Sequence, residues 1–374
     1  MTRIGRSLAL LVVGLILGSI RLNAQDYRIY RGCVHIHSTY SDGGGSVEEI
    51  AQAAQNAGLD YAVLTDHNTL QPLRDGKEGW YVNTLILIST ELSLPDGHFL
   101  ALNLPPDFTW DRNNTQRAIN QVNAAGGFGY FAHPISRWPW TNWNVTGFTG
   151  MELTNLSSLF HQEGTSQPLR LIGNFMRDYL ANSNRAMQRT MMVASDGSLE
   201  RWSEMIKSRQ TVGIGSVDAH ALIKIGGREL RIPSYGDIFR SLQIHILVPE
   251  SFNRDINHDK RLVYSALQNG RCYTAYTIWG DPSGFQYSAS RSGQSVVMGQ
   301  PIAREGGSVT LRVRVPGNQR TTTRIFRGPD RIFSTTLKSF SVPAPVAGAY
   351  RAEVDVTRDG RLVPWVISNP IYVR

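Results

Sequence analysis

The chain has 374 residues, of which 41% are hydrophobic and 18% are charged. This is an ordinary globular composition, and it excludes a disordered chain, a collagen and a multi-pass membrane protein. The formal net charge is +8; the basic residues are scattered, which is typical of a soluble surface, agrees with an anionic small-molecule substrate and gives no sign of a nucleic-acid partner.

The first 24 residues differ in kind from the rest. Arg3 and Arg6 precede an apolar run from Leu8 to Ile20, and Ala24 offers a small residue at a cleavage point. This pattern predicts a secretory signal peptide over residues 1–24. An uncleaved N-terminal anchor is the alternative, although the run is short for a membrane span. Cleavage would remove three Arg, lower the net charge from +8 to +5, and give a secreted or periplasmic chain without stable membrane insertion.

Residues 25–285 are predicted to form one α/β domain, because short apolar runs alternate with helical stretches. Repeated βα units favour a parallel sheet, either open or closed into a barrel. The expected strands are residues 30–37, 61–65, 84–89, 128–132, 150–153 and 212–216. The expected helices are residues 46–57, 115–125 and most of 169–192.

The sequence pattern changes after about residue 276. Gly and Pro separate short runs in which polar and apolar residues alternate, and no long helical periodicity remains. This predicts a small antiparallel, sandwich-like β domain over residues 290–374. Its expected strands are residues 308–315, 322–326, 339–342, 350–356 and 363–368.

The chain has two cysteines, Cys33 and Cys272. One bridge between them would be possible in an oxidising compartment. Because both lie in apolar, strand-like surroundings and neither has zinc-site spacing, we expect two buried thiols.

Six of the nine histidines follow predicted strands, beside acidic residues. In a parallel βα architecture the carboxyl ends of the strands meet on one face, so residues distant in sequence converge there. Imidazole and carboxylate groups together suit zinc, manganese or iron. A single histidine at a strand end is usually structural, but the joint pattern predicts a metal site. The pattern consists of His35-Ile36-His37 with Asp42, Asp66-His67, Glu91 with His98, His133, and Asp218-Ala219-His220.

These motifs, in this order, resemble the polymerase-and-histidinol-phosphatase (PHP) metallohydrolases over residues 31 to about 275. The resemblance implies a distorted barrel of seven βα units with two or three divalent ions. Two later segments, 270–273 and 364–373, are similar to the carbaryl-hydrolase-like (CehA/McbA) branch, which has a comparable C-terminal β domain.

When the family's ligand positions are transferred to this sequence motif by motif, the resemblance implies three metal positions. The first would be held by His35, His37, Glu91 and Asp218. Glu91 would bridge to the second, which is shared with His98 and His133. The third would be held by Asp42, His67 and His220. Asp42 stands where some members have His, and the spacing between Glu91 and His98 varies in the family.

Other residues near these motifs are candidates for substrate contact or support. Asp66 and Arg137 are the candidate catalytic residues, with Asp66 orienting a ligand and Arg137 holding a phosphate. The three Trp of residues 138–143 fit either a pocket wall or the packed rim of the barrel. Glu152 ends a predicted strand, where it could either support a metal ligand from behind or be an exposed surface carboxylate.

The pattern predicts a hydrolase in which metal ions activate water, so no Ser or Cys nucleophile is needed. A phosphoesterase acting on a small phosphate ester is the first expectation. A carboxylic ester, carbamate or amide hydrolase is the alternative, favoured by the C-terminal resemblance. A binding protein that holds metal without turnover is a third possibility from a different class.

Overall fold

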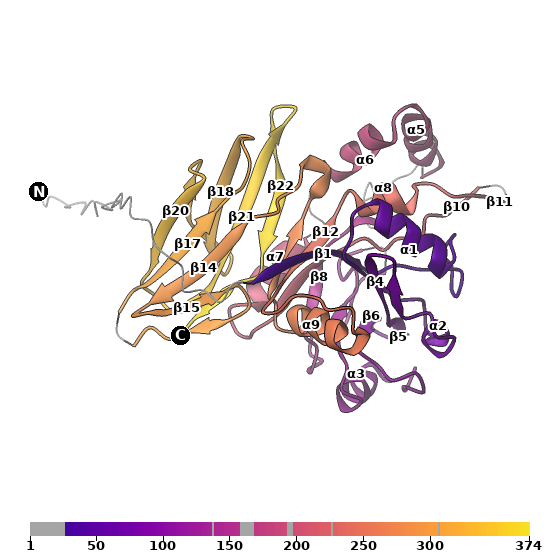
Figure 1. Ribbon diagram of the computed structural model, residues 1–374, viewed down its shortest axis with the longest axis horizontal. Helices are drawn as coiled ribbons and strands as arrows, with labels where there is room; N and C mark the ends of the chain where they lie inside the picture. The colour runs from indigo at the N-terminus through magenta and orange to yellow at the C-terminus, as the bar shows by residue number, and fades with distance from the viewer. Residues whose placement is uncertain (1–26, 137, 158–167, 193–196, 226, 306) are drawn as a thin grey trace, which may run out of the picture.

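The computed structural model describes residues 27–374 apart from 137, 158–167, 193–196, 226 and 306 (Figure 1). The predicted signal peptide and Arg137 therefore lie outside the described residues. Among the helices that the structure describes, none is long and apolar enough to cross a membrane.

Strands and helices alternate through the first three quarters of the chain. The strands are β1 (Arg28–Val34), β2 (Tyr61–Leu64), β3 (Gly79–Tyr81), β4 (Thr84–Ile88), β5 (Thr90–Leu94), β6 (Gly97–Leu102), β7 (Phe128–Phe131), β8 (Gly150–Asn155), β9 (Val212–Ser216), β10 (Ile223–Ile225), β11 (Arg228–Leu230), β12 (Gln243–Val248) and β13 (Cys272–Ala275). The helices are α1 (Val47–Asn56), α2 (Gln71–Arg74), α3 (Thr115–Ala124), α5 (Pro168–Ala181), α6 (Ser183–Met191), α7 (Ser198–Met205), α8 (Tyr235–Phe239), α9 (Ile256–Gln268) and the 3-10 turn η1 (Thr277–Trp279).

Local sequence signals set several of these boundaries. Ser46 begins α1 with a capping box, in which its side chain accepts from Glu49 N and the Glu49 side chain accepts from Ser46 N. The expected helix over residues 169–192 is divided into α5 and α6, because Asn182 leaves the helical conformation and caps α6 through Arg185 N.

Two sheets enclose the apolar core of this part of the chain. In the first sheet β1, β2 and β4 run parallel, and β12 and β13 extend it antiparallel. In the second sheet β5, β6 and β7 are antiparallel, whereas β7, β8 and β9 are parallel. Alternate residues of both sheets meet in one buried cluster, which removes a large apolar area from water. Members of this cluster include Val34, Val63, Leu87, Leu100, Tyr130 and Ile214.

Hydrogen bonds join the two sheets at the ends of the strands where the histidine motifs lie. Val217 N donates to Val34 O at 3.2 Å, and Ala219 N donates to His35 O at 3.0 Å. On the other side, β4 passes into β5 through one residue, and Glu91 N donates to Thr65 O at 3.1 Å. The ends of β1, β2 and β9 are therefore held close to the start of β5.

The closed seven-unit barrel is not confirmed. The strands around this core belong to two separate sheets, bridged by the isolated pairs Ile36–Ala219 and His67–Glu91. A tight turn at Pro95-Asp96 returns the chain antiparallel from β5 to β6 without a crossover helix. The fold is mixed α/β, with further β sheets in the C-terminal part.

The C-terminal strands pack as two layers (Figure 1). They are β14 (Gln286–Arg291), β15 (Gln294–Val297), β16 (Pro301–Ile302), β17 (Val309–Arg314), β18 (Thr321–Arg327), β19 (Asp330–Thr335), β20 (Ser339–Ala344), β21 (Gly348–Arg358), β22 (Arg361–Ser368) and β23 (Ile371–Val373). One layer is the four-stranded sheet β15-β14-β17-β20. The other contains β18, β21 and β22, and Tyr287 donates across to Tyr350 O at 2.8 Å.

The five expected C-terminal strands correspond to β17, β18, β20, β21 and β22. One feature was not expected: β22 pairs antiparallel with β13, so the first sheet runs on into the C-terminal layer. The two segments that resemble the carbaryl-hydrolase branch meet at this pairing, where Tyr273 is opposite Ser368. The domain boundary near residues 285–290 stays a prediction.

Both cysteines are buried and unpaired, as expected. Cys33 Sγ lies 3.3 Å from Leu242 O, and Cys272 Sγ accepts from Asn369 Nδ2 at 3.3 Å. Burial raises the pKa of both thiols, which keeps them neutral.

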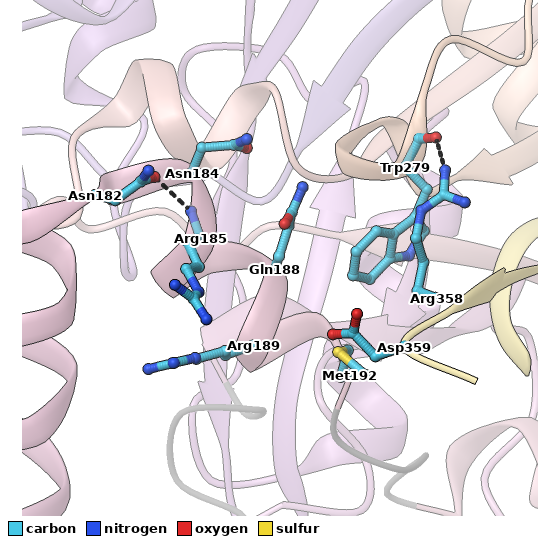
Figure 2. Close-up of a pocket in the computed structure, with 9 residues that line it drawn as sticks. All are labelled: Asn182, Asn184, Arg185, Gln188, Arg189, Met192, Trp279, Arg358 and Asp359. Carbon is cyan, nitrogen blue, oxygen red and sulfur yellow. Dashed lines mark hydrogen bonds between the residues drawn. The ribbon is translucent and has the colours of Figure 1, made fainter. Parts of the chain in front are cut away.

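A hollow of about 500 Å³ lies where α6 meets η1 and the turn after β21 (Figure 2). Arg185, Arg189 and Arg358 line it together with Trp279. Arg358 donates to Trp279 O at 2.7 Å, and Arg189 forms an ion pair with Asp178. No residue of the histidine motifs lines this hollow.

Candidate metal centre

All nine predicted metal ligands lie in one cluster at the joined ends of the two sheets. Glu91 is at its centre and is fully buried. Its two carboxylate oxygens lie 2.8–3.3 Å from ring nitrogens of five histidines, namely His35, His37, His67, His98 and His133. Asp218 and Asp42 flank this core, and His220 contacts both of them.

The four predicted ligands of the first position form a compact set. His35 Nε2 is 3.0 Å from Glu91 Oε2 and 3.4 Å from Asp218 Oδ1. His37 Nε2 is 3.3 Å from each of the same two oxygens. Two ligand atoms bound to one transition-metal ion at about 2.1 Å lie roughly 3.0–3.4 Å apart at coordination angles of about 90–110°. The spacing of His35, His37 and Glu91 therefore fits one shared ion, and Asp218 forms a second close group with His35 and His133.

The predicted second position lies on the other oxygen of Glu91. Oε1 is 2.8 Å from His98 Nδ1 and 3.1 Å from His133 Nε2. His98 reaches it from β6, opposite Ser93 of β5. His98 also forms a close donor group with Glu91 and His67, and its role as a metal ligand stays a prediction.

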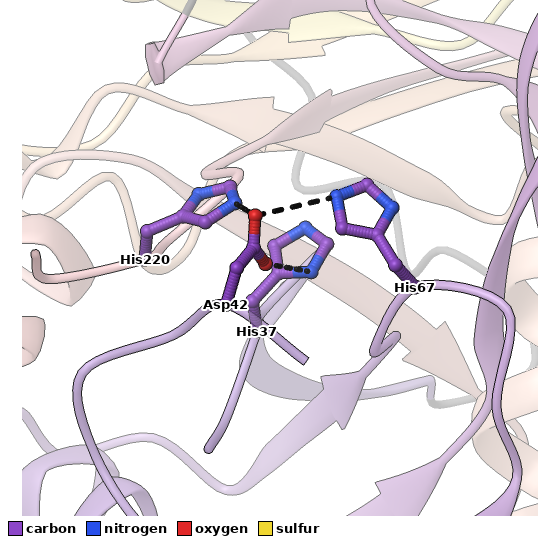
Figure 3. Close-up of side chains that lie close together, drawn as sticks. All are labelled: His37, Asp42, His67 and His220. Atoms are coloured by element: carbon purple, nitrogen blue, oxygen red, sulfur yellow. Dashed lines mark ion pairs between the residues drawn. The ribbon is translucent and has the colours of Figure 1, made fainter. Parts of the chain in front are cut away.

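The predicted third position, whose side chains Figure 3 shows, includes the most exposed of the nine predicted ligands, Asp42. Asp42 Oδ2 lies 3.3 Å from His220 Nε2 and 3.7 Å from His67 Nε2, and Asp42 Oδ1 lies 3.7 Å from His37 Nδ1. The Asp42 side chain is half exposed, whereas Glu91 is not. His67 also approaches Glu91, with Nδ1 3.2 Å from Oε2, so it lies between the first and third groups.

The ligand pairs do not follow simple strand alternation. β1 ends at Val34 and β9 at Ser216, so His35 and Asp218 lie beyond their strands. Both have left-handed backbones, with φ of 71° and 46°. The chain therefore bends at each pair, and Asp218 faces the first position while His220 faces Asp42.

Unpaired polar atoms in the cluster indicate that a cation fits there. Both ring nitrogens of His37 are buried without a hydrogen bond from any described residue, although Nε2 is close to two carboxylates. Burial alone would lower the pKa of His37, but the carboxylates of Asp218 and Glu91 outweigh it and raise the pKa to about 9. Positive charge is thus strongly favoured here, supplied either by protons or by metal ions.

Burial and neighbouring charges also oppose each other at Glu91 and Asp218. Burial opposes ionisation of Glu91 and Asp218, yet the surrounding histidines hold the pKa of both carboxyls well below the usual range. His67 behaves differently, because burial lowers its pKa to about 4. A neutral His67 has a free lone pair, which a metal ligand requires.

Asp66 supports the ligand loop rather than a histidine. Its carboxylate accepts from Ser38 N at 2.8 Å and from the hydroxyls of Ser38 and Ser41 at 2.7 Å. The loop also turns tightly at Gly43, where an added Cβ would lie 2.1 Å from His37 O. Ser38 and Ser41 are thus loop-fixing residues, and Asp66 is placed to orient Asp42 through that loop.

Two residues near the cluster were left open or missed by the sequence analysis. Glu152 is fully buried behind His35 and His133, so the exposed-surface alternative is wrong. Tyr235 was not singled out, yet its hydroxyl donates to His37 O at 2.7 Å and accepts from Gly45 N at 3.2 Å. Tyr235 lies beyond the ligand motifs and has no motif of its own, so only the fold reveals this contact.

The Trp-rich loop divides between packing and exposure. Trp140 is buried and stacks on Phe131 with ring centroids 4.1 Å apart. Trp143 meets Phe131 edge to face and lies under Arg201. These two residues pack the rim, whereas Trp138 is largely exposed. Arg137 is outside the described residues.

Comparison with protein families gives one match. The PHP domain model matches residues 34–194. Seven of the nine clustered side chains lie within the matched PHP segment, and Asp218 and His220 lie beyond it. The match and the clustered donor groups together support a metal-dependent hydrolase. A search of curated proteins found no match.

Solved structures with some likeness include a two-domain protein of Bacteroides vulgatus that contains a predicted PHP-like metal-dependent phosphoesterase. It is 14% identical, with 91% of this chain and 95% of that chain covered and a TM-score of 0.42. An amidohydrolase of Chromobacterium violaceum is 12% identical, with 55% and 92% covered and a TM-score of 0.34. At these TM-scores neither likeness bears on the activity of this chain.

Proposed function

We propose that the protein is a metal-dependent phosphoesterase that hydrolyses a small phosphate ester with two or three divalent ions. The observation that carries the proposal is the position of Glu91, whose two oxygens face different sets of histidines in a buried cluster. A carboxylate shared in this way fits neighbouring ions, and neighbouring ions suit displacement at phosphorus. The PHP match supports the same reading.

Within this proposal the chain's own residues have distinct tasks. His35, His37, Glu91 and Asp218 would hold the first ion, and His98 and His133 would hold the second together with Glu91. Asp42, His67 and His220 would hold the third. When bound, such ions supply a water of lowered pKa and neutralise charge that develops on the phosphoryl oxygens.

The donor set favours some metals over others. Six imidazoles with three carboxylates suit zinc, manganese or iron better than magnesium or calcium, which prefer oxygen ligands alone. The third group is the most exposed and is therefore expected to bind its ion most weakly. The distorted PHP barrel remains part of this proposal, with the two sheets as its two halves.

A carboxylic ester, carbamate or amide hydrolase is the second candidate, because residues 270–273 and 364–373 are similar to the carbaryl-hydrolase branch. The same ions would then stabilise a carbonyl oxygen instead of a phosphoryl oxygen. We further propose that the mature chain acts outside the cytoplasm on a small anionic molecule, which the N-terminal pattern and the net charge support.

The test is a comparison of substrates on metal-reconstituted mature protein. p-Nitrophenyl phosphate, bis-p-nitrophenyl phosphate and a naphthyl carbamate should be assayed side by side, with chelator-treated protein as the control. Turnover of a phosphate ester that is lost with the metal supports the proposal. Turnover of the carbamate alone favours the second candidate, and full metal occupancy without turnover favours a binding protein.

A further inference from the structure

Glu152 contacts two residues of the proposed metal centre from behind, His35 and His133. It lies on β8 and is fully buried. Its Oε1 is 2.7 Å from His35 Nδ1. Its Oε2 accepts from His133 N at 2.6 Å and from Asn155 Nδ2 at 2.9 Å. One carboxylate thus contacts a predicted ligand of the first position and a predicted ligand of the second.

We propose that Glu152 is a positioning residue, which fixes the tautomer of His35 and the backbone of His133 so that both face the ions. The inference rests on the proposed metal-dependent function and extends it to a residue outside the nine ligands.

The donor and acceptor roles of Glu152 and His35 determine the tautomer of His35. An ionised carboxylate can only accept hydrogen bonds, so His35 Nδ1 must donate to Glu152. In a neutral imidazole the lone pair is then on Nε2, which lies 3.0 Å from Glu91 Oε2 within the first group. Glu152 therefore keeps the nitrogen that faces the cluster free to bind an ion.

The backbones of His35 and His133 are strained. His35 and His133 have φ of 71° and 31°, in the left-handed region that residues with a side chain rarely occupy. Such conformations persist only where surrounding contacts fix them. The bond from His133 N to Glu152 is such a contact, and it holds the bend that turns the His133 ring toward Glu91.

A neutral amide cannot replace this carboxylate. In Glu152→Gln, an NH₂ group at the Oε2 site would face two donors, His133 N and Asn155 Nδ2. In the opposite orientation it would face His35 Nδ1 and force the proton onto Nε2, which blocks metal binding. Glu152→Asp keeps the charge, but its shorter side chain cannot reach His35 and His133 together.

The experiment measures Zn²⁺ affinity on chelator-stripped full-length protein by competition titration, with circular dichroism to confirm folding. We expect Glu152→Gln to weaken binding of the tightest Zn²⁺ by about 10- to 100-fold, and Glu152→Asp to recover part of that loss. Glu250→Gln is the matched control, since it is the same substitution at an exposed acid whose described ion-pair partner is His258. Its affinity should stay within about threefold of wild type.

A folded Glu152→Gln protein that binds Zn²⁺ as tightly as wild type overturns the role of Glu152. Should that variant fail to fold, Glu152→Asp decides the question: weaker binding supports the role, and unchanged binding overturns it. Wild-type protein that binds no Zn²⁺, Mn²⁺ or Fe²⁺ contradicts the proposed function itself, which is a separate outcome.

Discussion

Replacing Glu91 with glutamine should weaken metal binding more than any other isosteric change in the cluster. The substitution keeps the shape of the side chain but removes the charge at its centre. Five imidazole nitrogens lie 2.8–3.3 Å from its oxygens, so any ion bound among them lies at least as close to that charge. Among the described residues, the ion-pair partners of Glu91 are the histidines of the cluster, and no Lys or Arg pairs with it.

The size of the effect follows from this distance. At an effective dielectric constant of about 20, two unit charges 3 Å apart attract by about 5 kcal/mol. If the amide oxygen and relaxation recover half of that energy, about 2.5 kcal/mol is lost, which corresponds to roughly a 70-fold weaker affinity. A divalent ion doubles the charge, so this value is a lower bound.

The assay is a Zn²⁺ competition titration on folded Glu91→Gln, with phosphatase activity measured in parallel. Glu250→Gln is the control, because Glu250 is an exposed acid whose described ion-pair partner is His258. The control should keep wild-type affinity. Glu91→Gln protein with wild-type affinity and the same number of bound ions would refute the reasoning.

Three further predictions concern support, packing and pH. Asp66→Asn should lower the free energy of unfolding by about 1–3 kcal/mol, since a neutral amide accepts hydrogen bonds from Ser38 N and from the hydroxyls of Ser38 and Ser41 more weakly than a carboxylate does; an unchanged urea midpoint would contradict this. Trp140→Ala should lower the free energy of unfolding by about 3–5 kcal/mol, because it leaves a cavity beside Phe131, on which Trp140 stacks. A loss of less than about 1 kcal/mol would favour a pocket-wall role. Burial lowers the pKa of His245 to about 3. The His245 ring therefore stays neutral in the folded protein, whereas it gains a proton below about pH 6.5 in the unfolded protein. Relative to His245→Gln, wild type should lose up to about 1.4 kcal/mol per pH unit between pH 6.5 and 3, and parallel unfolding curves at pH 7 and 5 would exclude it.

The helices and strands that could be predicted are those with local signals, whereas β3, β5, β6, β10 to β13 and α7 to α9 were not among the expected elements. The apolar run of β4 and the capping box at Ser46 are both written in a few consecutive residues. The β5–β6 hairpin and the pairing of β13 with β22 were not foreseen. Both depend on which strand edges meet, and a single sequence does not encode that choice in its periodicity.

The ligand cluster could be predicted because each ligand follows a strand end, and the fold brings those ends together. The support behind the ligands could not be predicted in the same way. Glu152 and Tyr235 contact His35 and His37 across 117 and 198 positions of sequence. Their roles depend on left-handed bends at His35 and His133, which bring side chains and backbone groups together in ways that strand alternation does not imply.

The most direct test of the account is the metal content of the purified full-length protein, prepared without chelators and measured by elemental analysis. The geometry around Glu91 predicts two or three zinc, manganese or iron ions per chain, all removable by a strong chelator with a fall in melting temperature. Less than one such ion per chain, in folded protein supplied with these metals, would contradict the central claim.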